Sequence, residues 1–421
     1  MAYSLSYRRP ARVLSPKASL SDASRPTTGF RSILPRGIPE ALSFDRIIAG
    51  GTCPPMTARD FMHFAKYVEH SAENLQFFLW FKDFAGRFEA LTENERKLAP
   101  EWTREQTEVA HRTAYKNGSL ATEAAAILKA QRLDVASDPF CDAQATDTSV
   151  RDLARLASPT SAVDSVTSRQ AEGAFEDAGC VQPFTIQPYR EEISRIIALY
   201  VAEGAPRQLN LSSRERSSLL RALEVTTHPS AFRVVVETVE WSLRSQTHPN
   251  FVRWAICNGN RPRVTFARGL GVTCISAGLL TGVLITLSAA SRQWRVMAFL
   301  PFMVGISTLV AAWKGMCVVL HGLHRRHLRP WELFSGDDFK YDDDWATQEN
   351  LCSNSYEDEP WVAKYDQRNI VRKIFDREVW IEEPALRQIQ DTIFLQALLL
   401  ASAISILGTG IFCALPQGNF Y

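Results

Sequence analysis

Three kinds of side chain in this sequence could carry chemistry: cysteines, histidines and closely spaced carboxylates. The eight cysteines are scattered, with no CxxC pair and no Cys/His pair at zinc-binding spacing. Reduced, structural thiols are therefore expected, and a disulfide framework is not. His63 and His70 share one stretch with several aromatic residues, but no second pair of ligands accompanies them. The sequence therefore predicts no metal site and no cofactor.

The densest group of carboxylates lies in the run Gly336–Trp345, GDDFKYDDDW. It lacks the EF-hand spacing, which needs a Gly at the sixth position and a Glu at the twelfth. The run is interpreted as a solvated loop; the alternative is a site for a basic partner or for the cationic flank at 321–329. The sequence has no Gly-rich phosphate loop, no GxSxG and no HExxH motif. No catalytic residue is predicted, so the chain is not expected to be an enzyme.

Composition limits the classes of partner. The chain has 421 residues, more than an average domain, and a formal net charge of +1. A nearly neutral chain argues against nucleic-acid binding, because that needs clustered Lys and Arg. Residues 1–40 are rich in Ser, Pro and Arg and contain no apolar signal-peptide segment. They are predicted to form a disordered basic tail, whose alternative role is phosphorylation or contact with anionic lipid.

Three stretches near the C-terminus are apolar enough to cross a bilayer. They cover residues 269–290, 296–320 and 392–415. A membrane-spanning helix needs about 20 apolar residues, and soluble helices have a polar face that these stretches lack. Membrane lipid is therefore an expected partner. Only residues 291–295 separate the first two stretches, so they are predicted to form a helical hairpin. Gly278 and Gly282 have the GxxxG spacing of helix contacts, within the chain or between chains.

Basic residues beside these stretches predict their orientation. Those that precede the first stretch or follow the second are Arg261, Arg263, Arg268, Arg325, Arg326 and Arg329. Arg292 and Arg295, in the short turn, oppose them. The balance places the N-terminal region and the acidic 321–391 segment in the cytosol, at the plasma membrane or an endomembrane. Within that segment, 367–390 is expected to be a helix whose path Pro384 bends.

Residues 41–258 have the pattern of an all-α bundle. Thr57 and Asp60 match a capping box at a helix start. Aromatic residues then recur at helical spacing, at Phe77, Phe81, Phe84 and Phe88. An insertion of about 90–185 interrupts the bundle, with a short helical piece at 123–132. Its part at 134–180 is rich in Ala, Ser, Thr and Asp and is predicted to be disordered, because it has little large apolar surface to bury.

The residues Phe61–Trp80, FMHFAKYVEHSAENLQFFLW, resemble the signature of the RGS domain, the module that regulates heterotrimeric G-protein α subunits. Phe78 stands where Trp is usual in that signature. The run Gln208–Ser212, QLNLS, is similar to a loop of the same family, and the residues from Phe232 to Phe251 and beyond resemble its final helix pair. The resemblance covers about 44–88 and 184–257, on either side of the insertion.

This resemblance implies that residues 41–258 form a helical bundle that binds the GTP-loaded α subunit. The bundle would promote GTP hydrolysis by holding the α subunit's own catalytic groups in place. By position, the implied contact residues are Glu69, Glu73, Asn74, Asn210, Gln246 and Asn250. Gln246 and Asn250 stand where the family usually has an Asp and an Arg, so a charge pair is missing.

An RGS-like region followed by three apolar stretches resembles the fungal membrane RGS proteins tied to bud-site selection and cell polarity. The resemblance implies a membrane-anchored regulator of polarity or signalling. The missing charge pair favours the alternative of a non-catalytic RGS-like scaffold that marks a cortical site. Another membrane polarity protein, or a second copy of the chain, is a further partner left open. A transporter or channel is disfavoured, because the apolar stretches contain no paired charges.

Overall fold

The computed structural model describes most of the chain. The described residues are 7, 10, 12–13, 37–103, 105–109, 161–180, 186–334, 354, 359–416 and 418. The chain divides into two compact units. The anchor unit comprises residues 1–61, 244–338 and 357–421, and the head unit comprises 62–243 and 339–356. Both units are mostly helical, which confirms the predicted helical class.

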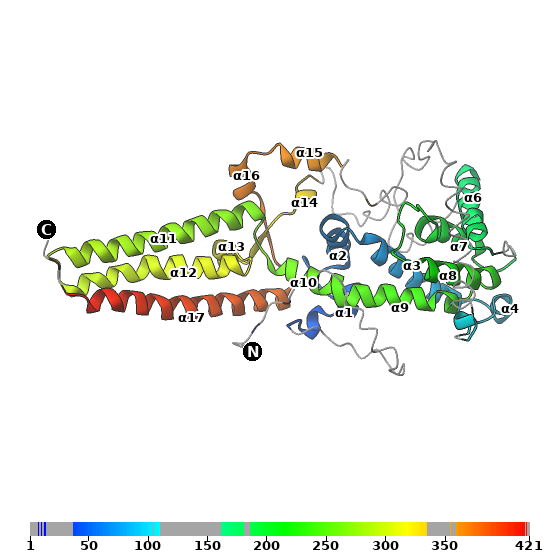
Figure 1. Ribbon diagram of the computed structural model, residues 1–421, viewed down its shortest axis with the longest axis horizontal. Helices are drawn as coiled ribbons and strands as arrows, with labels where there is room; N and C mark the ends of the chain where they lie inside the picture. Colours follow the sequence, from blue (N-terminus) through cyan, green and yellow to red (C-terminus); the bar gives the residue numbers. More distant parts are fainter. Residues whose placement is uncertain are drawn as a thin grey trace. The chain divides into compact units, whose positions relative to one another are not determined.

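The described residues of the head unit are mostly helical (Figure 1). Its α-helices are α3 (Ala72–Glu89), α4 (Glu93–Lys97), α6 (Ser161–Asp177), α7 (Arg190–Ile196), α8 (Ser213–Val225) and α9 (Arg233–Ser242). The described part of the unit also has two π-helical turns, η2 (Ala65–Glu69) and η3 (Ile197–Val201), and one 3-10 turn, η4 (Pro229–Phe232). Helix α2 (Ala58–Phe64) and the π-helical turn η5 (Leu243–Thr247) cross the boundaries between the units.

Aromatic side chains of α3 form the core of the head unit. Phe77 and Phe84 are fully buried, and Phe88 is nearly so. The ring of Phe232 lies 6.2 Å from Phe77 and 6.1 Å from Phe84, between centroids. Such aromatic pairs add to the free energy of burial. The predicted aromatic stripe is therefore confirmed as a core face, although Phe81 is only half-buried.

Helix α6 corrects the prediction that all of 134–180 is disordered. Ala171, Ala174 and Phe175 are buried on its inner face, and the helix packs on α7, α8 and η3. Two alanines and one Phe make a narrow apolar stripe, which a search for large apolar residues passes over. Residues 134–160 and the helical piece expected at 123–132 lie outside the described residues.

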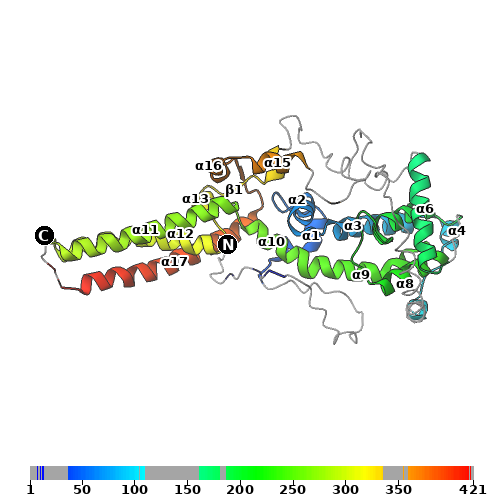
Figure 2. The same cartoon turned by 45° about the horizontal axis from the view of Figure 1, so that its top comes forward.

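The anchor unit contains three long helices that run side by side (Figures 1 and 2). They are α11 (Arg261–Leu287), α12 (Phe299–Trp313) and α17 (Pro384–Ala414). A 3-10 turn, η6 (Arg292–Ala298), leads directly into α12. Helices α11 and α17, and the continuous segment Arg292–Trp313 formed by η6 and α12, are each long and apolar enough to cross a membrane, as the sequence predicted. The run Gly336–Trp345 lies outside the described residues.

Shorter elements surround one end of the three long helices. They are η1 (Glu40–Leu42), α1 (Phe44–Ile48), α10 (His248–Ile256), α13 (Val318–Gly322), α14 (Pro330–Phe334), α15 (Pro360–Asp366) and α16 (Ile370–Ile374). Two strands, β1 (Arg325–His327) and β2 (Glu378–Trp380), pair antiparallel, with Arg326 opposite Val379. A capping box forms at the start of α2, where the Asp60 carboxylate accepts from the Thr57 hydroxyl at 2.6 Å and from its backbone N–H at 3.1 Å.

Two predicted boundaries in the anchor unit were wrong. The helix over the second apolar stretch ends at Trp313 and does not reach residue 320. The chain turns at Gly315, whose φ of +83° favours glycine. The segment 367–390 is not one helix, since α16, β2 and the start of α17 divide it. Pro384 begins α17 and does not bend it: a proline suits the first turn, where its missing N–H has no helical partner to lose.

Glycines allow the long helices to approach closely. A Cβ added at Gly271 would lie 2.8 Å from the Leu309 side chain and 3.1 Å from the backbone oxygen of Gly305. Added at Gly278 or Gly282, it would meet an aromatic ring of α12 or of α17. Small residues at helix interfaces permit such contact in lipid. The predicted GxxxG contact is therefore confirmed within the chain.

One arginine closes the other end of the three helices. Arg295 is fully buried, and its Nη1 donates to the backbone oxygens of Phe412 at 2.8 Å and Leu415 at 2.6 Å. These carbonyls lie in the last turn of α17, where no further helical N–H can reach them. A cation also suits the negative end of the helix dipole. Arg295 is therefore engaged in structure, so it is a poor indicator of orientation.

Candidate functional site

Three of the residues implied by the resemblance lie where the π-helical turn η2 gives way to α3. Glu69 ends η2, and Glu73 and Asn74 lie in the first turn of α3. His70, between them, has a φ of +56° and redirects the chain. All three implied contact residues are half-buried. Burial raises the pKa of Glu73, although hydrogen bonds from its own backbone and from Asn354 oppose the shift.

Asn210 occupies the apex of a tight turn. The backbone N–H of Leu211 donates to the oxygen of Leu209 at 2.8 Å, which closes a three-residue turn around Asn210. Leu209 and Leu211 are both buried, whereas Asn210 is exposed. Directly after the turn, Ser212 caps helix α8, and its hydroxyl donates to Glu215 at 2.7 Å. The turn thus anchors its apolar neighbours inward and presents the Asn210 amide to solvent.

Tyr200 connects the Asn210 turn to the start of α3. Its ring lies 5.9 Å from that of Phe77, one turn along α3 from Glu73 and Asn74. Its backbone oxygen accepts from the N–H of Leu209 at 2.9 Å. Burial raises the pKa of Tyr200, with Arg207 opposing the shift and the nearby Glu73 adding to it. The head unit therefore brings together parts of two of the three sequence blocks that carry the resemblance, the one that contains Phe77 and the one that contains Asn210.

A second set of contacts fixes α3 to α7. The indole N–H of Trp80 donates to Glu192 at 2.7 Å. Arg87 donates to both oxygens of the same carboxylate, at 2.9 Å and 2.6 Å. Charge-assisted, bidentate pairs of this kind hold a defined geometry. These bonds fix the middle and the end of α3 against α7.

Gln246 and Asn250 lie in the anchor unit. Gln246 is half-buried in η5, and Asn250 is 8 % exposed in α10. The Asn250 amide donates to the backbone oxygen of Val13 at 2.8 Å and accepts from its N–H at 2.9 Å. Arg253 donates to the oxygen of Pro10. Asn250 therefore binds the chain's own N-terminal segment, which the sequence assigned to a disordered tail.

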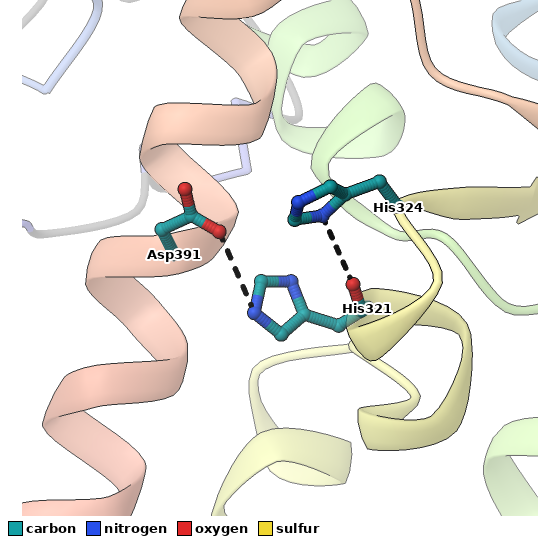
Figure 3. A group of neighbouring side chains, drawn as sticks. All are labelled: His321, His324 and Asp391. Carbon is teal, nitrogen blue, oxygen red and sulfur yellow. Dashed lines mark hydrogen bonds and ion pairs between the residues drawn. The ribbon is translucent and has the colours of Figure 1, made fainter.

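A group of potential metal ligands was not predicted from the sequence. His321, His324 and Asp391 place one ligand atom each within 4.8 Å of the others (Figure 3). The two histidines follow α12, and the aspartate lies in α17, so no local motif contains all three. The only sequence signal is the His-x-x-His spacing of the first two.

Comparison with protein-family models, with curated proteins and with solved structures found no match. The function of the chain is therefore inferred from its own residues and their arrangement.

Proposed function

We propose that this chain is a membrane-anchored regulator whose head unit binds a heterotrimeric G-protein α subunit and promotes GTP hydrolysis. The three long helices of the anchor unit hold the chain in a membrane, with the N-terminal region in the cytosol. The α subunit supplies the catalytic groups, and the head unit positions them. Polarity or signalling at the cell cortex is the process that such a regulator affects.

The exposed amide of Asn210 is the observation that carries this proposal. A side-chain amide both donates and accepts hydrogen bonds, so it can orient a water molecule or a partner's side chain. The Asn210 turn is anchored by buried leucines, and Tyr200 links it to the helix that carries Glu73 and Asn74. A preorganised group of this kind loses little entropy when a partner binds.

The test is single-turnover GTP hydrolysis by a purified, GTP-loaded α subunit with the full chain in detergent micelles. The wild type is expected to raise the hydrolysis rate. Asn210→Ala is expected to reduce that acceleration by at least about tenfold, because loss of one positioning donor typically costs this much or more. Ser213→Ala is the matched control, since Ser213 is exposed in the first turn of α8, close to Asn210 in sequence.

The outcomes separate the possibilities clearly. If the saturating wild-type chain accelerates no α subunit tested, the regulator proposal is rejected. If Asn210→Ala and Ser213→Ala accelerate equally, Asn210 does not have the proposed role.

One observation favours a second candidate, a non-catalytic scaffold. Asn250, which stands where the RGS family usually has an Arg, is buried against Val13 and carries no charge. A scaffold would bind the α subunit without changing its chemistry. Capture of the α subunit in its transition-state-mimic form, together with an unchanged hydrolysis rate, would support this candidate.

A further inference from the structure

Two histidines and one aspartate converge beside the start of α17. His321 lies in α13, His324 follows in the turn after it, and Asp391 lies in the second turn of α17 (Figure 3). Their three ligand atoms lie within 4.8 Å of one another. The Nε2 atom of His321 is 3.6 Å from Oδ1 of Asp391, which is longer than a hydrogen bond. Bonds of about 2.0–2.2 Å to a tetrahedral zinc ion would separate two ligand atoms by about 3.4 Å.

The His324 ring is held in the orientation that a metal ligand needs. Its Nδ1 lies 3.1 Å from the backbone oxygen of His321, so Nδ1–H donates and Nε2 keeps its lone pair. Figure 3 shows that Nε2 is on the side of the ring that faces Asp391. Metal-bound histidines usually donate their other ring N–H to a carbonyl or carboxylate in this way. The His324 ring also packs edge-on against Trp380, with 5.7 Å between centroids.

The backbone at His324 is strained. Its φ is +50°, in the left-handed region that a residue other than glycine adopts only rarely. Ile381, just after β2, holds it there by donating its N–H to the His324 oxygen at 3.0 Å. Strain of this kind persists where the surrounding structure imposes it, and it concentrates at functional sites. Here the turn directs the second imidazole back toward the first.

The His321 ring lies in an apolar setting. It is 5 % exposed, and its centroid lies 4.7 Å from that of Phe394. Its Nδ1 is buried and has no hydrogen-bond partner among the described residues. Its other ring nitrogen, Nε2, is the one that faces Asp391.

We propose that His321, His324 and Asp391 bind one divalent transition-metal ion of the Zn²⁺ class, which ties α13 and the turn after it to α17. Two imidazoles and a carboxylate suit zinc and its first-row neighbours, whereas Mg²⁺ and Ca²⁺ prefer oxygen ligands alone. Three protein ligands leave a fourth position, which water fills in sites of this type. The ion would join the end of the second apolar stretch to the start of the third.

Cobalt is the probe, because four-coordinate Co²⁺ absorbs visible light far more strongly than the hydrated ion. The full chain, purified in detergent and stripped with a chelator, is titrated with Co²⁺ and then with Zn²⁺. The intense visible bands are expected to saturate near about one equivalent and to disappear when Zn²⁺ displaces Co²⁺. Absence of intense bands at saturating Co²⁺ in the wild-type chain would overturn the proposal.

His324→Asn is the informative variant, because asparagine tolerates the left-handed conformation and removes the imidazole. His70→Asn is its matched control. His70 also has a positive φ, +56°, and its Nδ1 lies 3.2 Å from the backbone oxygen of Lys66, but among the described residues it belongs to no group of potential metal ligands. His324→Asn and Asp391→Asn are expected to weaken cobalt binding at least about tenfold, and His70→Asn to leave it unchanged. Equal binding by all four proteins would assign the metal to another site and refute the proposal.

Discussion

The head unit buries its large aromatic side chains, whereas the long helices of the anchor unit expose many of their large apolar side chains. In the head unit, Phe77, Phe84 and Phe232 are fully buried. In α17, Leu407 is 69 % exposed, whereas Ser405 is fully buried. Water drives apolar side chains into the protein interior. In a membrane, lipid chains surround an exposed leucine as favourably as a neighbouring helix would. This pattern is typical of helices in water for the head unit and of helices in lipid for the long helices of the anchor unit.

The two regions are also held together differently. Aromatic rings fill the head unit, where burial of apolar surface supplies the stabilisation. In the anchor unit, Gly271 and Gly305 let α11 and α12 approach until backbone meets backbone. In lipid, where no hydrophobic effect drives helices together, such close approach stabilises their packing through dispersion contacts. Truncation of a large side chain should therefore destabilise the core of the head unit most, and enlargement of a glycine should destabilise the contacts between the long helices most.

Phe84→Ala should have the largest effect on stability. Phe84 is fully buried among the rings of Trp80, Phe88 and Phe232. Truncation removes its burial and leaves a cavity, so the free energy of unfolding should fall by about 3–5 kcal/mol. Urea unfolding of the full chain in detergent, followed by tryptophan fluorescence, measures this loss.

Leu407→Ala is the matched test in the anchor unit. Because the Leu407 side chain faces outward, its truncation should change the free energy of unfolding by less than about 0.5 kcal/mol. A loss comparable to that of Phe84→Ala would mean that Leu407 is packed against protein, and the comparison between the two regions would fail.

Gly271→Leu should have the next largest effect. A Cβ alone would crowd Leu309 and the Gly305 backbone, so a leucine forces α11 and α12 apart at a cost of about 3 kcal/mol. Gly269→Leu, two residues away, is the control, since nothing lies within 4 Å of a Cβ added there. Thermal unfolding in detergent should separate the two variants; equal melting temperatures would show that the helices are not closely packed at Gly271.

The free energy of unfolding should depend on pH through His248, which lies outside the long helices. Burial lowers the pKa of His248 from 6.5 to about 4, while the hydrogen bond of its Nε2 to the Leu42 oxygen opposes the shift. Between pH 6.5 and about pH 4, His248 is protonated in the unfolded chain but neutral in the folded chain, so stability falls as pH falls through this range. Between pH 7.5 and pH 5 the loss from this residue should be about 2 kcal/mol.

His248→Gln keeps an N–H donor for Leu42 and removes the titration. The loss of stability between the two pH values should be smaller in this variant than in the wild type by the same amount. Parallel pH profiles for the two proteins, measured by urea unfolding, would contradict the assignment to His248.

Local patterns predicted much of the fold. The three apolar stretches, the aromatic stripe at Phe77 and Phe84, and the capping box at Thr57 each lie within one short segment, so periodicity and capping rules apply to them directly. The limits of those rules appear where contacts between distant segments decide the structure. Pairing of β1 with β2 divides the segment expected to be one helix, and Gly315 ends the second apolar stretch early.

The candidate sites show the same division. Asn210 was identified because a short run of residues resembles a family loop, and its exposed turn is consistent with that prediction. The group around His324 could not be predicted, because Asp391 reaches it only through the packing of α13 against α17. Asn250 was predicted to face a partner, yet its side-chain amide bonds the backbone of Val13, 237 residues away in the sequence.

The buried guanidinium of Arg295 has a consequence for how the protein is made. Its acceptors, the carbonyls of Phe412 and Leu415, leave the ribosome long after α11 and α12 are complete. Until then Arg295 lacks these acceptors, and a buried guanidinium without hydrogen-bond partners destabilises the fold. A chain that ends before residue 412 would therefore leave the Arg295 guanidinium without the carbonyls that bind it in the complete fold.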